Sequence, residues 1–213
     1  MTDGPALVIA APMRIEALAL RGAAPGARLV RTGLGPRRAA AAAPALAPAA
    51  GGQWALAVAG LCAGLDPAMR PGDVVVASEV RGPHGTVRCD GAGLLVAALQ
   101  RRGLDPRVGA VVSVDHIVQG EERARLLAGG AIAADMESAF LAGAVAGGGA
   151  FGVLRVVLDA PGRELKRPGL AVAAARALRV LRRSAPALQE WTTGNATTMQ
   201  CASRNAVIPK EVT

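Results

Sequence analysis

Residues 6–11 read Ala-Leu-Val-Ile-Ala-Ala, an apolar run without a charge, and an amphipathic stretch follows from Ile15 to Arg21. A run this short and continuous is typical of a strand buried on both faces. The same alternation continues through most of the chain. Beyond the first strand we expect strands at 27–32, 55–61, 73–78, 108–114 and 151–158, and helices at 36–46, 93–102, 120–128, 136–146 and 169–183.

Apolar strands that alternate with helices predict an α/β fold whose sheet is covered by helices on both faces. The chain has 213 residues, of which 52% are hydrophobic and 19% charged. This composition is enough to bury a core and too apolar for a disordered chain. We expect one domain over residues 1–191. Residues 192–213 change to Thr, Asn, Ser and Gln without periodicity and are predicted to form a tail.

Cysteine usage and sorting signals indicate a protein of the cytoplasm. Cys62, Cys89 and Cys201 are too few for a disulfide framework, and no CxxC pair offers a zinc site. The first residues lack the basic segment of a secretory signal. The most apolar window, residues 138–154, contains three consecutive glycines and is too short for a membrane span. We expect a soluble protein, at most peripheral to the inner face of the membrane.

The formal net charge of +8 has two explanations. Lysine and arginine total 24 against 16 acidic residues, and such an excess favours nucleic acid or an anionic membrane surface. Binders of single-stranded nucleic acid usually add stacking aromatic residues, whereas aromatics make up 2% of this chain and tyrosine is missing. A coding bias toward arginine and alanine explains the charge as well, so we expect no nucleic-acid partner.

Acidic and glycine-rich groups follow several expected strands, at the edge where α/β proteins bind ligands. Glu16 follows the first strand, residues 60–64 (Gly-Leu-Cys-Ala-Gly) end the third, and Asp159 ends the last. Asp135 and Glu137 open a helix after a short apolar run. Three carboxylates at Glu16, Glu137 and Asp159 can divide general-acid, general-base and substrate-clamping work.

Each of these side chains also has a purely structural explanation. Glu16 fits an exposed acid in the first turn of a helix, where it favours the helix dipole. Asp135 fits an N-cap and Glu137 a first-turn acid, while Asp159 stands where a turn begins before Ala-Pro-Gly. His116 is expected to be a hydrogen-bonded structural histidine.

The order of these segments resembles the purine nucleoside phosphorylase and nucleosidase superfamily, above all the methylthioadenosine/S-adenosylhomocysteine nucleosidases, over residues 6–190. The resemblance implies a three-layer αβα sandwich with a central, mixed, largely parallel and twisted sheet, and a homo-oligomer, namely a dimer. It is carried by residues 11–16 (Ala-Pro-Met-Arg-Ile-Glu), 32–35 (Thr-Gly-Leu-Gly), 60–65 (Gly-Leu-Cys-Ala-Gly-Leu), 71–76 (Pro-Gly-Asp-Val-Val-Val), 135–139 (Asp-Met-Glu-Ser-Ala) and 155–159 (Arg-Val-Val-Leu-Asp).

Four segments narrow the resemblance to the nucleosidases of hopanoid biosynthesis, namely residues 62–65, 113–116, 135–138 and 156–161. The implied function is the release of adenine from adenosylhopane by hydrolysis of its N-glycosidic bond. Phosphorolysis of the same bond and methylthioadenosine/S-adenosylhomocysteine nucleosidase activity are the alternatives. A nucleoside- or lipid-binding module on the same fold is the non-catalytic alternative, against which the three intact carboxylates argue.

The resemblance also implies a role for each residue. Asp159 is expected to protonate or hydrogen-bond N7 of adenine, and Glu16 to orient or deprotonate the attacking water. Glu137 is expected to hold the sugar hydroxyls and stabilise the developing positive charge. No metal or cofactor is needed, because protonation activates the leaving group. The expected substrate-binding residues are Gly60, Leu61, Cys62, Ile117, Val118 and Met136, of which Met136 packs against the sugar.

Three positions are more apolar than the pattern that the sequence resembles. Leu158 replaces a serine before the catalytic aspartate, Ile117 stands where an aromatic packs on the base, and Leu61 replaces a small polar residue near the sugar. These changes agree with an adenine nucleoside that carries a large apolar body at its 5′ end. Such a lipid-linked substrate would require peripheral contact with a membrane.

The attacking group is either water or phosphate. Phosphate as a co-substrate needs cationic side chains around it, whereas the carboxylate of Glu16 would repel an anion. Hydrolysis is therefore favoured. The candidate cations for the alternative are Arg14, Arg37, Arg38 and Arg155.

Overall fold

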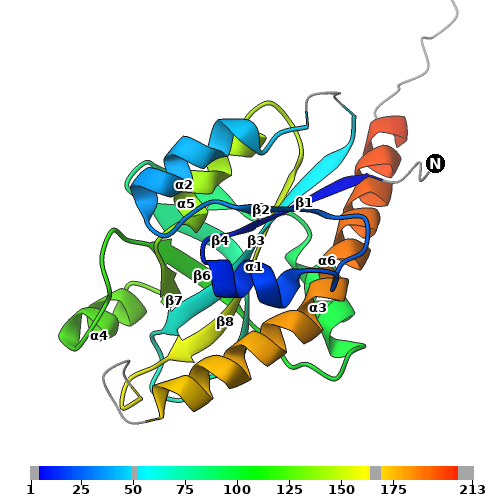
Figure 1. The fold of residues 1–213 in the computed structure, drawn as a ribbon. Coiled ribbons are helices and arrows are strands. Elements are labelled where there is room, and N and C mark those ends of the chain that lie inside the picture. Colours follow the sequence, from blue (N-terminus) through cyan, green and yellow to red (C-terminus); the bar gives the residue numbers. More distant parts are fainter. Residues whose placement is uncertain (1–4, 49–51, 164–168, 206–213) are drawn as a thin grey trace, which may run out of the picture.

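The computed structural model describes residues 5–48, 52–163 and 169–205. The chain forms three layers, in which α2 and α5 cover one face of the sheet and α1, α3 and α6 cover the other (Figure 1). The strands are β1 (Ala6–Ala11), β2 (Arg28–Arg31), β3 (Trp54–Gly64), β4 (Val74–Gly82), β5 (Gly85–Arg88), β6 (Arg107–Ser113), β7 (Ala131–Asp135) and β8 (Ala150–Asp159). The helices are α1 (Arg14–Leu20), α2 (Pro36–Ala42), α3 (Ala92–Gln100), α4 (Glu121–Ala128), α5 (Ser138–Leu141) and α6 (Leu170–Asn205), with short 3-10 turns at Ala43–Ala45 and Ala142–Val145.

The sheet is mixed, and part of it closes on itself. Strand β3 pairs in parallel with β1 on one side and with β8 on the other. Strand β8 then pairs with β4, β4 with β6, and β6 with β7. The last residues of β3 return to β7, where Ala63 pairs with Ala134 in antiparallel register. After a register shift between Cys62 and Ala63, Ala63 pairs with Asp159 of β8 as well as with Ala134 of β7. Such β-bulges are common at barrel rims.

Alternate residues of the central strands face two separate cores. Ile9 of β1 packs in one cluster with Trp191 of α6, whereas its neighbour Val8 packs in the other with Leu141 of α5. This arrangement explains why the strands are apolar at every position instead of every second one. The predicted three-layer αβα fold is confirmed.

The sequence predicted most elements near their observed bounds but did not predict strands β5 and β7. Strand β5 is exposed at all four residues, so it lacks the apolar pattern by which a buried strand is recognised. Strand β7 lies in the short apolar run before Asp135. In the described part of the chain, no helix has the length and apolar character needed to cross a bilayer.

The predicted tail from residue 192 is wrong for residues 192–205, which continue α6. Thr192 is buried, and its hydroxyl donates to the carbonyl of Leu188 at 2.8 Å. The amide of Asn195 donates to the carbonyl of Asp90 at 3.5 Å. These side-chain bonds and tertiary contacts override the weak helix propensity of Thr and Asn. The rest of the predicted tail, 206–213, lies outside the described residues.

Candidate active site

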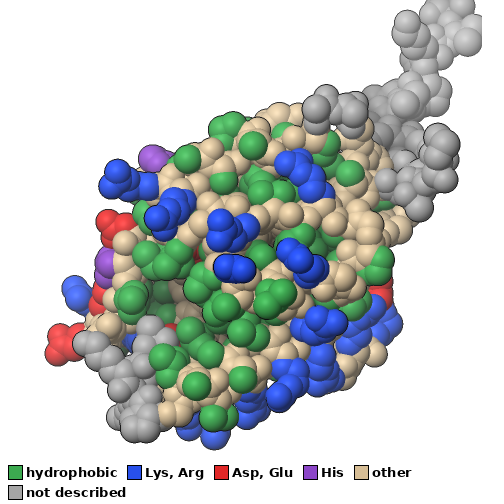
Figure 2. Space-filling view, viewed as in Figure 1, with side chains coloured by type: hydrophobic (Ala, Val, Ile, Leu, Met, Phe, Trp, Pro, Cys, Tyr) green, Lys and Arg blue, Asp and Glu red, His purple; other side chains and the backbone are tan. Residues whose placement is uncertain are grey.

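The ends of β3, β7 and β8 meet around one pocket with a volume of about 180 Å³. The bulge at the end of β3 brings these three strands together, although residues 63, 134 and 159 are far apart in the sequence. Figure 2 shows a hollow on this face, bordered by hydrophobic side chains. Glu16, Glu137 and Asp159 all line the pocket, so the fold assembles the three carboxylates that the sequence singled out.

Glu16 lies in the first turn of α1 but is only 1% exposed. Its Oε1 accepts a hydrogen bond from the backbone N–H of Leu61 at 2.7 Å, and its Oε2 accepts one from Met13 at 2.6 Å. Burial raises its pKa, while the charge of Arg155 and the two backbone donors act in the opposite direction. The explanation of Glu16 as an exposed helix acid is therefore wrong. Both oxygens are held in place toward the pocket.

Glu137 occupies the N-cap position of α5, but its side chain makes no capping hydrogen bond. Its Oε1 instead accepts from the backbone N–H of Gly35 at 2.9 Å, and its Oε2 lies 3.6 Å from Nη2 of Arg155. Burial raises its pKa, and Arg155 opposes that shift. Asp135 supplies the cap, since its Oδ1 accepts from the backbone N–H groups of Glu137 and Ser138 at 3.2 Å. Glu137 is thus free to face a ligand.

Asp159 is 4% exposed at the end of β8. Its Oδ2 is paired with the guanidinium of Arg123, which is itself buried. Arg123 lies outside the sequence motifs that predict the site. Arg123 stands three residues before Leu126 and four before Leu127, so the three residues share the inward face of α4. This spacing is the sequence pattern from which the burial of Arg123 could have been predicted.

A second buried arginine, Arg155, lies next to Glu137 and outside the lining of the pocket. Nη2 of Arg155 lies 2.7 Å from Oδ2 of Asp135 and donates to Oγ of Ser138 at 2.9 Å. Ser113 donates to Oδ1 of Asp135 at 2.5 Å. These contacts hold the segment that carries Glu137. Arg155 was a candidate phosphate ligand, but the structure commits its Nη2 to this internal network.

Five of the six expected substrate-binding residues line the pocket, namely Leu61, Cys62, Ile117, Val118 and Met136. Gly60 is not among the lining residues. A methyl group at Gly60 would lie 2.6 Å from Oε1 of Glu16 and 2.8 Å from Nη1 of Arg155, so this glycine makes room for the two charged side chains. Burial raises the pKa of the Cys62 thiol, which makes it a neutral part of the wall.

Apolar side chains dominate the mouth of the pocket. Ile117 and Leu34 line it while remaining 56% and 49% exposed, and Leu158 lies beside Asp159 in the wall. His116 lines the mouth as well and bonds to the carboxylates of the exposed Asp115 and the half-buried Glu122 at 2.7 Å and 2.9 Å. These two carboxylates raise the pKa of His116.

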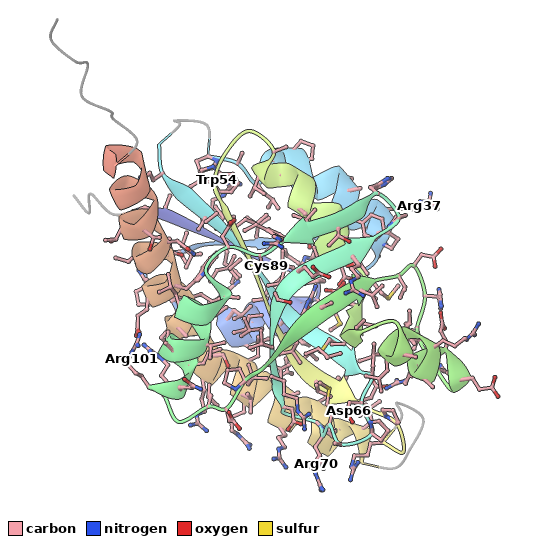
Figure 3. All side chains as sticks on the ribbon, turned by 180° about the vertical axis from the view of Figure 1, so that it is seen from behind. Arg37, Trp54, Asp66, Arg70, Cys89 and Arg101 are labelled. Atoms are coloured by element: carbon pink, nitrogen blue, oxygen red, sulfur yellow. The ribbon has the colours of Figure 1, made fainter. Side chains whose placement is uncertain are left out.

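Cations are scarce at the pocket itself. Among the described residues, the lining includes neither lysine nor arginine. Arg14 lines a different groove, and Arg37 lies on the outer face of α2 (Figure 3). In the same described ranges, no group of three or more His, Cys, Asp or Glu side chains is arranged to hold a metal ion.

Residues 19–186 match the family model of the phosphorylase superfamily. The chain belongs to the phosphorylase superfamily. No protein with a curated function matches it by sequence. This family and the similarity of the fold to solved nucleosidase structures support an enzyme of the nucleosidase or phosphorylase type.

Three solved structures are similar to this chain over nearly their whole length. A Campylobacter jejuni 5′-methylthioadenosine/S-adenosyl homocysteine nucleosidase has a TM-score of 0.75 at 16% identity, covering 88% of this chain and 99% of that one. A Streptococcus pyogenes S-adenosylhomocysteine nucleosidase in complex with 5-methylthiotubericidin has a TM-score of 0.72 at 20% identity. The match covers 91% of this chain and 98% of that one. A Helicobacter pylori futalosine hydrolase mutant has a TM-score of 0.71 at 16% identity. The match covers 88% of this chain and 98% of that one.

Proposed function

We propose that this chain hydrolyses the N-glycosidic bond of an adenine nucleoside, and that its substrate is adenosylhopane. The observation that carries the proposal is the convergence of Glu16, Glu137 and Asp159 on one pocket. A binding module has no need for three carboxylates that are each buried and individually hydrogen-bonded, because burying a charge is costly.

The chemistry follows from the surroundings of each carboxylate. Asp159 carries a proton on its carboxyl group when the substrate is bound and passes it to N7, so the base leaves as neutral adenine and Asp159 becomes the carboxylate that pairs with Arg123. As the C1′–N9 bond breaks, positive charge develops on the sugar, and Glu137 stabilises it while holding the sugar hydroxyls. Glu16 accepts a proton from the water that attacks C1′. Its raised pKa makes it a stronger base than an exposed glutamate.

Water is favoured over phosphate by the charges around the pocket. The lining residues of the described chain include Glu16, Glu137 and Asp159 but neither lysine nor arginine. An anionic nucleophile would meet these carboxylates directly, whereas the cations that offset them, Arg123 and Arg155, lie outside the lining. Phosphorolysis remains the second candidate only because Arg155 lies behind the pocket.

The lipid-linked substrate is supported by the apolar surface around the mouth. Ile15 and Leu18 of α1, the helix that carries Glu16, are 47% and 64% exposed, and we propose that they act together with the exposed Leu34 and Ile117 as an apolar rim. Arg14 and Arg21 lie around a groove beside Leu18 and would attract anionic lipid, each contributing about 1 kcal/mol near a membrane surface. We propose peripheral contact of this rim with the membrane, and a dimer as the working oligomer.

The proposal is tested by measuring adenine release from adenosine, methylthioadenosine, S-adenosylhomocysteine and adenosylhopane. We expect adenosylhopane to have the highest kcat/KM. A clear preference for methylthioadenosine would contradict the lipid-linked substrate and leave the nucleosidase intact. Binding of these nucleosides without adenine release would support the non-catalytic module.

Membrane contact is tested by co-sedimentation with anionic vesicles at low and high salt. Leu18→Asp should reduce vesicle binding. Val108→Asp is the matched control, because Val108 is 50% exposed but lies at the amino end of β6, away from the site. Equal loss in both variants, or binding unaffected by salt, would contradict contact through the rim.

A further inference from the structure

Arg123 of α4 is 2% exposed, although Arg125 of the same helix is exposed. Its guanidinium contacts three separate segments. Nε donates to the carbonyl of Val118 at 3.2 Å, Nη1 donates to the carbonyl of Gly64 at 3.0 Å, and Nη2 donates to Oδ2 of Asp159. The planar guanidinium presents its donors in a fixed geometry, so these contacts set the three segments relative to one another.

All three segments belong to the part of the pocket assigned to the base. Val118 and Asp159 line the pocket, and Gly64 directly follows the lining residue Ala63. Arg123 itself does not line the pocket. Its influence on a ligand therefore passes through the residues that it holds, above all through the carboxylate of Asp159.

We propose that Arg123 is a positioning residue for the cleavage reaction, which orients Asp159 toward the leaving base. The ion pair engages Oδ2 of Asp159 from the protein side and thereby fixes the rotation of the carboxyl group. The contact with Val118 holds the connection between β6 and α4, which lines the same end of the pocket. This inference rests on the proposed function and adds a residue whose role lies outside the three carboxylates.

A second observation indicates that the pair serves more than stability. A buried ion pair is costly to desolvate and is often replaceable by apolar residues of similar size without loss of stability. Here Arg123 bonds to the backbone of Val118 and of Gly64, and Val118 and Leu65, the residue after Gly64, belong to a small apolar cluster. An apolar pair would fill that space but would leave the base without an oriented carboxyl group.

The test compares Arg123→Met, Arg123→Lys and the control Arg125→Met. We expect Arg123→Met to lower kcat for adenine release by roughly a hundredfold, the scale for a misplaced catalytic group, with a smaller change in KM. Arg123→Lys keeps a cation near Asp159 and should recover part of that loss. Arg125→Met should match the wild type. A kcat for Arg123→Met within about twofold of the wild type would overturn the proposal.

A double-mutant cycle separates positioning from folding. If Arg123 acts through Asp159, adding Arg123→Met to Asp159→Asn should lower kcat by less than about threefold further, because the two residues act as a unit. Effects that multiply would overturn the proposal. The double variant removes both charges and so avoids an unpaired buried ion, and its thermal unfolding shows whether it is folded.

Adenine binding by calorimetry distinguishes this proposal from the proposed function. If the wild type releases no adenine from any nucleoside, the proposed function fails. Arg123 is then judged by its effect on adenine affinity, which Arg123→Met should weaken by about tenfold while Arg125→Met leaves it unchanged. Equal adenine affinity in the wild type and Arg123→Met would overturn the positioning role.

Discussion

The guanidinium of Arg155 lies 2.7 Å from the carboxylate of Asp135, and the two side chains are 0% and 1% exposed. Burial disfavours the charged form of each group, but their mutual attraction offsets part of that cost. The pair ties β8 to the segment after β7, and Glu137 lies two residues beyond Asp135. The orientation of Glu137 in the pocket therefore depends on an ion pair whose cation, Arg155, is not among the residues that line the pocket.

Arg155→Met should lower the free energy of unfolding by about 3–5 kcal/mol, because it leaves buried carboxylates without their cation. The control is Arg107→Met. Arg107 pairs at 3.4 Å with Asp66 but is 42% exposed, so its loss should cost at most about 1 kcal/mol. Urea unfolding of both variants measures the difference. Equal costs would show that the buried pair contributes no more than a surface pair.

Asp159→Asn should reduce adenine release by about a hundredfold or more, the usual range for a general acid, and should lower the melting temperature without unfolding the protein, because Arg123 stays buried without its carboxylate. The amide keeps the size of the side chain but cannot supply a proton. Steady-state kinetics and thermal unfolding of the same preparation check the two halves of this statement. Near-normal turnover would remove Asp159 from the mechanism.

The sequence was sufficient for the carboxylates because each follows a buried strand, and strand ends converge in α/β folds. It was not sufficient for the arginines that hold them. Arg123 and Arg155 resemble the other arginines of a basic chain until the fold shows that both are buried. Asp159, the partner of Arg123, lies 36 residues along the chain, and Asp135, the partner of Arg155, lies 20 residues away. No local sequence pattern encodes contacts over such separations.

The closure of the sheet was also beyond the sequence. Strand β3 pairs with β1 up to Val58 and with β7 from Ala63, while it stays paired with β8. The bulge after Cys62 leaves no mark on an apolar run. The end of α6 was hidden for a different reason. Thr192 and Asn195 are poor helix formers, and only their contacts with the backbone of Leu188 and Asp90 explain why the helix continues.

The pH dependence of kcat should reflect the buried glutamates. Glu16 must be ionised to accept a proton, and burial raises its pKa above the ordinary 4.5. Activity is therefore lost as the pH falls through a value above 4.5. Burial also raises the pKa of Glu137. The acid limb of the pH profile therefore reflects the titration of Glu16 and Glu137 together. A pH profile whose acid limb lies at or below 4.5 would contradict this account.

Gly60→Ala should lower kcat without filling the pocket. The added methyl group would meet Oε1 of Glu16 at 2.6 Å and Nη1 of Arg155 at 2.8 Å, so one of these charged side chains must move. We expect a loss of roughly a hundredfold, as for other small displacements of catalytic groups. Gly143→Ala is the control, because nothing lies within 4 Å of its added methyl group. Similar kinetics for both variants would show that Gly60 has no role in placing Glu16.

We propose that water, directed by Glu16, cleaves the bond to adenine. This hydrolysis is tested by chromatography of the products formed from adenosylhopane, with and without phosphate, coupled to mass spectrometry of the sugar-containing product. The account predicts equal adenine release in both buffers, a product with a free hydroxyl at the anomeric carbon, and loss of that product in Glu16→Gln. A strict requirement for phosphate, with a sugar 1-phosphate as the product, would contradict it.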